Sequence, residues 1–232
     1  MKSIIKYCSL ILLGANIFAA TLNAASVNWT KATISSDLDI SNVGTEIGAF
    51  NFGTSASPTI NGVAFAGITP GAPYGNNAFA FGSSSAPFSS LSADYQTLLQ
   101  SGSFRPDTAP FGFTDLTIGQ EYQFQIWVND SRALAANRTL TLTGGANSIT
   151  LSQNTTGTDG GLGQFAIGTF VADATNQDIS AAGTLEDGTT PGGTLINGYR
   201  FSAVPEPQTY LMLGITGLFM GIVVIRRRKP RI

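Results

Sequence analysis

The sequence contains no histidine and only one cysteine, Cys8, among its 232 residues. The lack of histidine excludes a Ser-His-Asp triad and every other histidine-dependent mechanism. Because Cys8 lies in the leader described below, the rest of the chain has no nucleophilic thiol and no His or Cys metal site. No G-x-S-x-G motif occurs. The sequence therefore predicts that the protein is not an enzyme.

Basic residues are also scarce between the two ends of the chain. Residues 26–204 carry 5 basic and 13 acidic side chains, a formal net charge of −8, whereas the whole chain has −2. Phosphate backbones are bound by concentrated basic surfaces, so we expect no nucleic-acid partner. The charge also argues against acidic polymers as ligands, unless calcium bridges them. The length of this segment suits one domain with a sizeable core.

The N-terminus has the form of a secretory signal peptide. Two lysines supply its positive charge, and the apolar run over 8–20 is too short to span a membrane comfortably. Small residues follow, and we expect cleavage after Ala24 or Ala25. We assign residues 1–25 to this signal, which predicts export through the Sec machinery.

The C-terminus combines three features in order. Pro205, Glu206 and Pro207 precede a 16-residue apolar run over 210–225, and a basic tail follows over 226–232. The basic residues of the tail are Arg226, Arg227, Arg228, Lys229 and Arg231. As a helix the apolar run is about 24 Å long, which is short for a bilayer core of roughly 30 Å. Basic residues hold this end in the cytoplasm, which places residues 26–204 on the outer side.

This arrangement resembles the PEP-CTERM sorting signal of exported bacterial proteins, over residues 205–232. The resemblance implies processing by exosortase, a membrane peptidase, with Glu206 as a substrate residue on an extended segment. It further implies an inner-membrane anchor before processing, and then delivery to the cell surface or extracellular matrix of a Gram-negative bacterium. A plain single-span anchor is the alternative.

The middle segment reads as all-β. Glu121–Val128 alternates, with Tyr122, Phe124, Ile126 and Val128 predicted to point inward and Trp127 on the opposite face. Two further strands are expected over 138–143 and 164–171, with a bulge at Gly168. The other predicted strands are 47–52, 60–66, 78–81, 113–118, 148–151, 177–181 and 195–202. One helix is predicted over 90–102, capped by Ser90 and stopped by Gly102.

Short strands separated by glycine-rich turns favour a single β-sandwich for residues 26–204. Residues 67–90, rich in Gly, Pro, Ser and Ala, are expected to form a long surface loop. The segments 116–132 and 167–177 resemble galactose-binding-like jelly rolls, which often serve as carbohydrate-binding modules. That resemblance implies a jelly-roll-like sandwich with a sugar site.

Trp127, Asn129, Asp130 and Arg132 are the candidate ligand-binding residues. An exposed indole offers sugar rings an apolar platform, and the polar residues at the strand end can hydrogen-bond hydroxyls. In the structural alternative, the long loop covers Trp127 while Asp130 and Arg132 only pair at a turn. Arg138 is a second candidate, whose alternative is a pair with a carboxylate.

Calcium is the one metal considered, since oxygen ligands suffice for it. Asp159, Asp173 and Asp178 are its candidate ligands, and solvated turn carboxylates are the alternative; no EF-hand spacing occurs. The segment 26–204 has enough acidic side chains for a glycosidase that uses two carboxylates, although no sequence spacing identifies a catalytic pair. We therefore expect no resident cofactor and a non-catalytic ectodomain that binds extracellular polysaccharide. The alternative is a structural or adhesive matrix protein with no glycan site.

Overall fold

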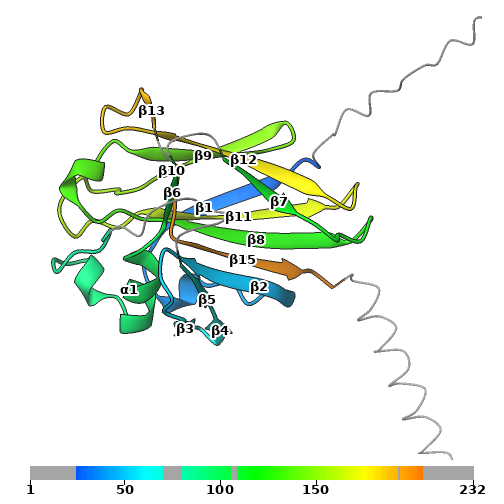
Figure 1. Cartoon of the computed structure of the whole chain (residues 1–232), viewed down its shortest axis with the longest axis horizontal. Coiled ribbons are helices and arrows are strands. Elements are labelled where there is room, and N and C mark those ends of the chain that lie inside the picture. Colours follow the sequence, from blue (N-terminus) through cyan, green and yellow to red (C-terminus); the bar gives the residue numbers. More distant parts are fainter. Residues whose placement is uncertain (1–24, 70–79, 106–108, 193, 206–232) are drawn as a thin grey trace, which may run out of the picture.

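The computed structural model describes residues 25–69, 80–105, 109–192 and 194–205. Residues 1–24 of the expected signal peptide lie outside the described residues, as do Glu206, Pro207, the apolar run and the basic tail. Within the described ranges, no helix combines the length and apolar content that crossing a bilayer requires. The described chain is an all-β sandwich (Figure 1).

The larger sheet has six strands in the order β1–β11–β8–β15–β2–β5. They are β1 (Asn28–Thr33), β2 (Thr45–Phe52), β5 (Ala66–Ile68), β8 (Glu121–Val128), β11 (Gln164–Val171) and β15 (Gly198–Ala203). Neighbours pair antiparallel except β2 and β5, which are parallel. The centre of this sheet is β8, as its long alternating pattern indicates.

The second sheet runs β10–β9–β12–β13, and β7 also pairs with β12. Its strands are β7 (Ala109–Phe113), β9 (Thr139–Gly144), β10 (Asn147–Ser152), β12 (Gln177–Thr184) and β13 (Pro191–Gly192). Two small pairs complete the strands: β3 (Thr59–Ile60) with β4 (Val63–Ala64), and β6 (Ser103–Arg105) with β14 (Thr194–Ile196). The α-helix is α1 (Ala93–Leu99), and 3-10 turns occupy Asp37–Asp39, Phe88–Ser90 and Ala133–Ala135.

The main core lies between the two sheets. The four inward residues predicted for β8 belong to it, together with Leu140 and Leu142 of β9 and Ile179 of β12. Aromatic rings fill its centre, where Phe113 stacks on Phe201 with centroids 4.4 Å apart. The core therefore relies on apolar burial alone, because the described residues include no cysteine.

The bulge predicted at Gly168 is wrong, because β11 keeps an unbroken register with both neighbours. A Cβ at Gly168 would lie 2.5 Å from the Phe124 ring, so the glycine makes room for that ring. A register shift occurs instead in β15, between Phe201 and Ser202.

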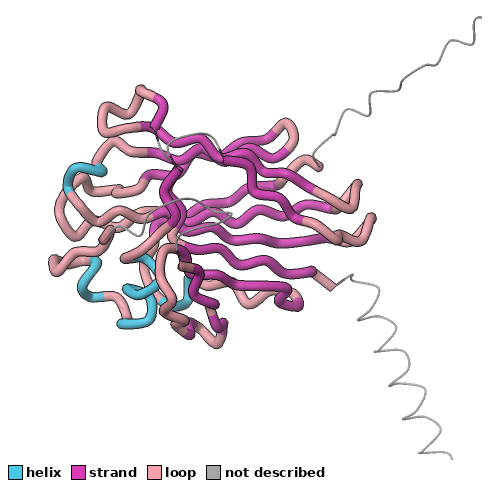
Figure 2. Tube along the Cα trace, in the orientation of Figure 1, coloured by secondary structure: helices cyan, strands magenta, loops and turns pink. Residues whose placement is uncertain are grey.

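A second apolar cluster covers the outer face of the larger sheet. It joins Trp127 and Phe165 of the sheet to Tyr95, Leu98 and Leu99 of α1 and to residues of the segments 34–40 and 60–65. Figure 2 shows the helical turns gathered at one end of the sandwich. The larger sheet is therefore buried on both faces over much of its area.

Several predicted boundaries need correction. The strand expected over 113–118 is wrong: β7 ends at Phe113, and Asp115 has a φ of +59°. The strand expected over 60–66 is a hairpin, because Asn61 and Gly62 have positive φ at its turn. The 195–202 strand is split at Asn197. The helix cap is Ser92 rather than Ser90, since the Ser92 hydroxyl accepts from the Tyr95 amide. Part of the 78–81 strand lies outside the described residues, and residues 80–81 are not in a strand.

Candidate functional site

Trp127 is fully buried, so the expectation of an exposed indole platform is wrong. Its Nε1 donates to the hydroxyl of Tyr95 at 3.0 Å, and its ring meets Phe65 edge-on. Tyr95 comes from α1, which is therefore part of the cover. The indole has no face left for a sugar ring.

The polar residues that share this face of β8 are also buried, beneath the segment 37–43. Gln125 Oε1 accepts from the Ser41 amide at 2.9 Å, and its Nε2 donates to the Asp39 carbonyl at 2.7 Å. Gln123 Oε1 accepts from the Ser41 hydroxyl. Alternation thus identified the residues that share a face, but the polar half of the pattern lines a second layer rather than the solvent.

Asn129 is buried as well, in a network centred on Asn197. The backbone amide of Asn129 donates to Asn197 Oδ1 at 2.6 Å. Asn197 Nδ2 donates to the carbonyls of Leu99, Ser101 and Asn129 at 2.8–3.1 Å. This network ties the end of β8 to the end of α1, so Asn129 has a structural role.

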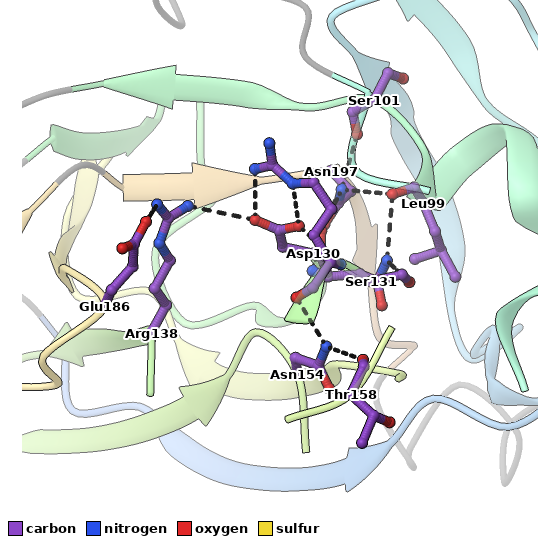
Figure 3. A network of polar contacts seen from close by, with 11 residues as sticks. Leu99, Ser101, Asp130, Ser131, Arg138, Asn154, Thr158, Glu186 and Asn197 are labelled. Carbon is purple, nitrogen blue, oxygen red and sulfur yellow. Dashed lines mark hydrogen bonds and ion pairs between the residues drawn. The ribbon is translucent and has the colours of Figure 1, made fainter. Parts of the chain in front are cut away.

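Asp130 forms ion pairs with two arginines, Arg132 and Arg138, and Figure 3 shows its contact with Arg138. Its side chain is 0% exposed and accepts from Arg132 Nε and Nη2, both at 2.7 Å, and from Arg138 Nη1 at 3.3 Å. The bonds to Asp130 raise the pKa of Arg132 above its ordinary value. Arg138 Nη2 also donates to Glu186 at 2.7 Å. Arg132 therefore pairs with Asp130, and Arg138 pairs with both Asp130 and Glu186.

Two loop segments, at Phe81 and at residues 153–154, hold this group of charges in place. The Asp130 amide donates to the Gln153 carbonyl, and the Ser131 amide donates to the Phe81 carbonyl at 2.7 Å. Asn154 Nδ2 donates to the carbonyl of Arg132 at 3.1 Å. Loops that are distant in the sequence therefore fix the backbone of residues 130–132, which carries Asp130 and Arg132.

These guanidinium groups line a cavity of about 200 Å³ together with Phe81 and Phe104, which we name the end cavity. Phe81 is buried and carries the Arg132 guanidinium over its ring, 5.2 Å from the centroid. Phe104 of β6 is half-buried. The side chains of Arg132 and Arg138 are 35% and 17% exposed. Of the four candidate residues, Arg132 alone reaches a surface that a ligand can contact.

A second cavity of about 320 Å³ lies where the described chain begins and ends. Ala25, Glu121 and Asp173 are among its lining residues, and the Val204 amide donates to the Glu121 carbonyl at 2.9 Å. Because β8 runs from Glu121 to Val128, this cavity and the end cavity are at opposite ends of the sandwich (Figure 1).

The calcium candidates are not brought together as a ligand set. Within the described ranges, no three His, Cys, Asp or Glu side chains come close enough to hold a metal ion. The Asp159 carboxylate accepts from the hydroxyls of Ser85 and Ser83 at 2.6 and 2.8 Å, and these bonds lower its pKa. Asp173 and Asp178 are exposed.

Sequence reasoning missed Phe81, Phe104 and Glu186. They come from the expected long loop, from a three-residue strand and from the turn between β12 and β13. No local pattern distinguishes them, because only the fold brings them to the arginines. The one available signal was that Arg132 and Arg138 lie close together in a segment with few basic residues.

No protein-family model matches the chain, and no curated protein matches it. Among solved structures, it resembles a calcium-binding mutant of Bacteroides uniformis β-glucuronidase 2. The two share 15% sequence identity with a TM-score of 0.42. The match covers 68% of this chain and 18% of the enzyme chain.

Proposed function

We propose that this protein is an exported surface or matrix protein whose jelly-roll-like sandwich binds extracellular polysaccharide, without catalysis, at the end cavity. The observation that carries the proposal is the end cavity itself, where two guanidinium groups and the half-buried ring of Phe104 face one concave space. Sugar sites combine apolar ring surface with a few fixed donors in this way. Arg132 is a fixed donor because Asp130 and Phe81 hold it.

The same geometry favours binding over hydrolysis. Glycosidases need two carboxyl groups facing the scissile bond. The described lining of the end cavity consists of two phenylalanines and two arginines. Asp130 lies beneath them, and its carboxylate oxygens are engaged by the two guanidinium groups.

For the sorting step we propose processing by exosortase at Pro205, Glu206 and Pro207. Val204, directly before this motif, is hydrogen-bonded to the sandwich on both sides of its peptide unit. Its backbone amide donates to the Glu121 carbonyl, and its carbonyl accepts from Gln120 Nε2. Pro205 of the motif therefore directly follows a residue whose backbone is hydrogen-bonded to the sandwich. An anchor at this end leaves the end cavity on the far side of the domain, open to a matrix polymer.

Binding is tested with the full-length chain solubilised in detergent. We expect saturable retention on a panel of neutral and acidic glycans, assayed with and without calcium. The variants Phe104→Ala and Arg132→Gln should lose retention, whereas Lys31→Gln, a matched loss of charge on the distant strand β1, should keep it. Retention that survives both cavity variants would place the ligand elsewhere.

Sorting is tested separately, in a host that has an exosortase. The wild-type chain should lose its C-terminal segment, which mass spectrometry detects, and should leave the membrane fraction. Glu206→Ala should keep its full mass and stay in the membrane fraction. Processing of Glu206→Ala at the wild-type rate would exclude the motif as the recognition element.

A structural or adhesive matrix role is the second candidate. It is favoured by the burial of Trp127, Asn129 and Asp130, which turns three of the four predicted binding residues into internal supports. Absence of retention on every glycan, from a protein that unfolds cooperatively, would favour this role.

A further inference from the structure

Two of the five basic residues of the segment 26–204 line the end cavity. Lys31 donates to the Thr150 carbonyl, and Arg200 is 3% exposed, beside Glu46. Arg132 and Arg138 instead both line the cavity. Charges beyond about 10 Å are largely screened at physiological salt, so the net charge of −8 does not decide what this cavity attracts.

The local charges leave an opening for an anion. Asp130 is fully buried and neutralises one of the two guanidinium groups. Glu186 neutralises the other, but its side chain is 59% exposed. A carboxylate that is largely in solvent is held only weakly by such a pair, so the Glu186 carboxylate is replaceable.

Arg138 also has a donor left over. Its Nε is buried and has no hydrogen-bond partner among the described residues. Buried donors in proteins are nearly always paired, so this unpaired donor leaves the Arg138 guanidinium group with incomplete hydrogen bonding. A carboxylate can take two parallel bonds from one guanidinium group, which a hydroxyl cannot do.

The turn between β12 and β13 presents Glu186 at the cavity. Asp187 Oδ1 accepts from the amides of Thr189 and Thr190, at 2.9 and 2.8 Å, so the turn keeps its form without the Glu186 side chain. The hydrogen bonds from the Thr189 and Thr190 amides to Asp187 therefore remain when the Glu186–Arg138 contact is lost.

We propose that the end cavity binds a carboxylate-bearing sugar unit, a uronate, whose carboxylate replaces Glu186 on Arg138. The inference rests on the proposed glycan site and specifies its ligand. Glu186 acts as an internal competitor that sets the affinity, and Arg138 is the residue that selects charged units over neutral ones.

The test uses full-length chain in detergent and two probes of similar length, oligogalacturonate and a neutral glucan oligomer. Isothermal titration should show binding to oligogalacturonate that weakens as salt rises. Glu186→Gln removes the competing charge and should tighten this binding about two- to fivefold, the range that an exposed ion pair allows. Glu46→Gln, which removes a carboxylate from the ion pair with Arg200, should leave the affinity unchanged.

Arg138→Lys keeps the positive charge but loses the two parallel N–H donors of the guanidinium group. It should weaken oligogalacturonate binding at least tenfold while leaving any glucan binding in place. A thermal melt confirms that the variants fold. Glucan binding that equals oligogalacturonate binding, or Glu186→Gln binding that is unchanged or weaker, would overturn the uronate inference while the glycan-binding function stands. No binding of either probe, or of any other glycan, would overturn both.

Discussion

The Nε1 of Trp127 donates to the hydroxyl of Tyr95, and that hydroxyl donates in turn to Asp39 Oδ2 at 3.1 Å. This chain of two bonds joins the central strand β8 to α1 and to the 3-10 turn at Asp37–Asp39. Tyr95 is itself 0% exposed. The bonds therefore hold the second layer against the outer face of the larger sheet.

Trp127→Phe should destabilise the domain without affecting glycan retention. The variant removes a buried donor and part of a packed ring, which we expect to cost about 2–3 kcal/mol of unfolding free energy. Urea unfolding of the full-length chain in detergent measures the loss. Trp29→Phe is the matched control, since that indole is half-buried and should cost less. A stable Trp127→Phe variant that has lost glycan retention would mean that the Trp127 indole does contact the ligand.

The free energy of unfolding should fall at alkaline pH, because the fold disfavours the ionised form of Tyr95. Burial first, and then the Asp39 carboxylate, raise the pKa of Tyr95 well above its ordinary value. The fold therefore favours the protonated phenol, and this contribution is complete below the unfolded-state pKa near 10. It is lost as pH rises toward the folded-state pKa.

Tyr95→Phe lacks this ionisation, although it leaves the Trp127 donor unpaired. The variant should be about 1–3 kcal/mol less stable than wild type at pH 8, and this gap should narrow above pH 10. Urea titrations of both proteins at pH 8, 10 and 11 supply the comparison. A gap that stays constant with pH would exclude Tyr95 as the titrating group.

The sequence predicted the central strands well and their surroundings poorly. Alternation located β8 with its correct bounds and inward face, because residue period depends only on local geometry. What covers the other face depends on α1 and on the segments 34–40 and 60–65, which come from elsewhere in the chain. Trp127 was therefore assigned to the right face but given the wrong environment.

The residues of the candidate site were likewise predictable from the sequence only in part. Arg132 could be predicted because polar residues at a strand end are typical of binding sites. Phe104 and Glu186 could not, since one lies in the short strand β6 and the other in an ordinary polar turn. Tertiary pairing alone places them beside the arginines.

Asp130→Asn should destabilise the loops that build the end cavity. The amide keeps the shape but removes the charge that two guanidinium groups share. Breaking a buried ion pair costs about 3–5 kcal/mol, and we expect about 3 because both arginines reach solvent. Urea unfolding gives the value. Asp173→Asn, an exposed carboxylate, should change stability by less than about 0.5 kcal/mol. Equal effects of the two variants would mean that Asp130 has no special structural role.

Asn197→Asp should be among the most damaging isosteric changes in the domain. It replaces an Nδ2 that donates to three carbonyls with an oxygen that repels them. Three acceptors lose their donor in a buried site, so we expect a loss of about 3 kcal/mol or more at pH 8. Because the site disfavours the charged form, the pKa of the new carboxyl should be raised in the fold, and protonation at pH 4–5 should recover part of the stability.

Urea titrations of this variant and wild type at pH 8 and pH 4.5 measure that recovery. Asn176→Asp, on the exposed surface before β12, should show a small and pH-insensitive change. A defect in Asn197→Asp that is as large at pH 4.5 as at pH 8 would mean that lost packing, rather than repulsion between the carboxylate and the three carbonyls, is the cause.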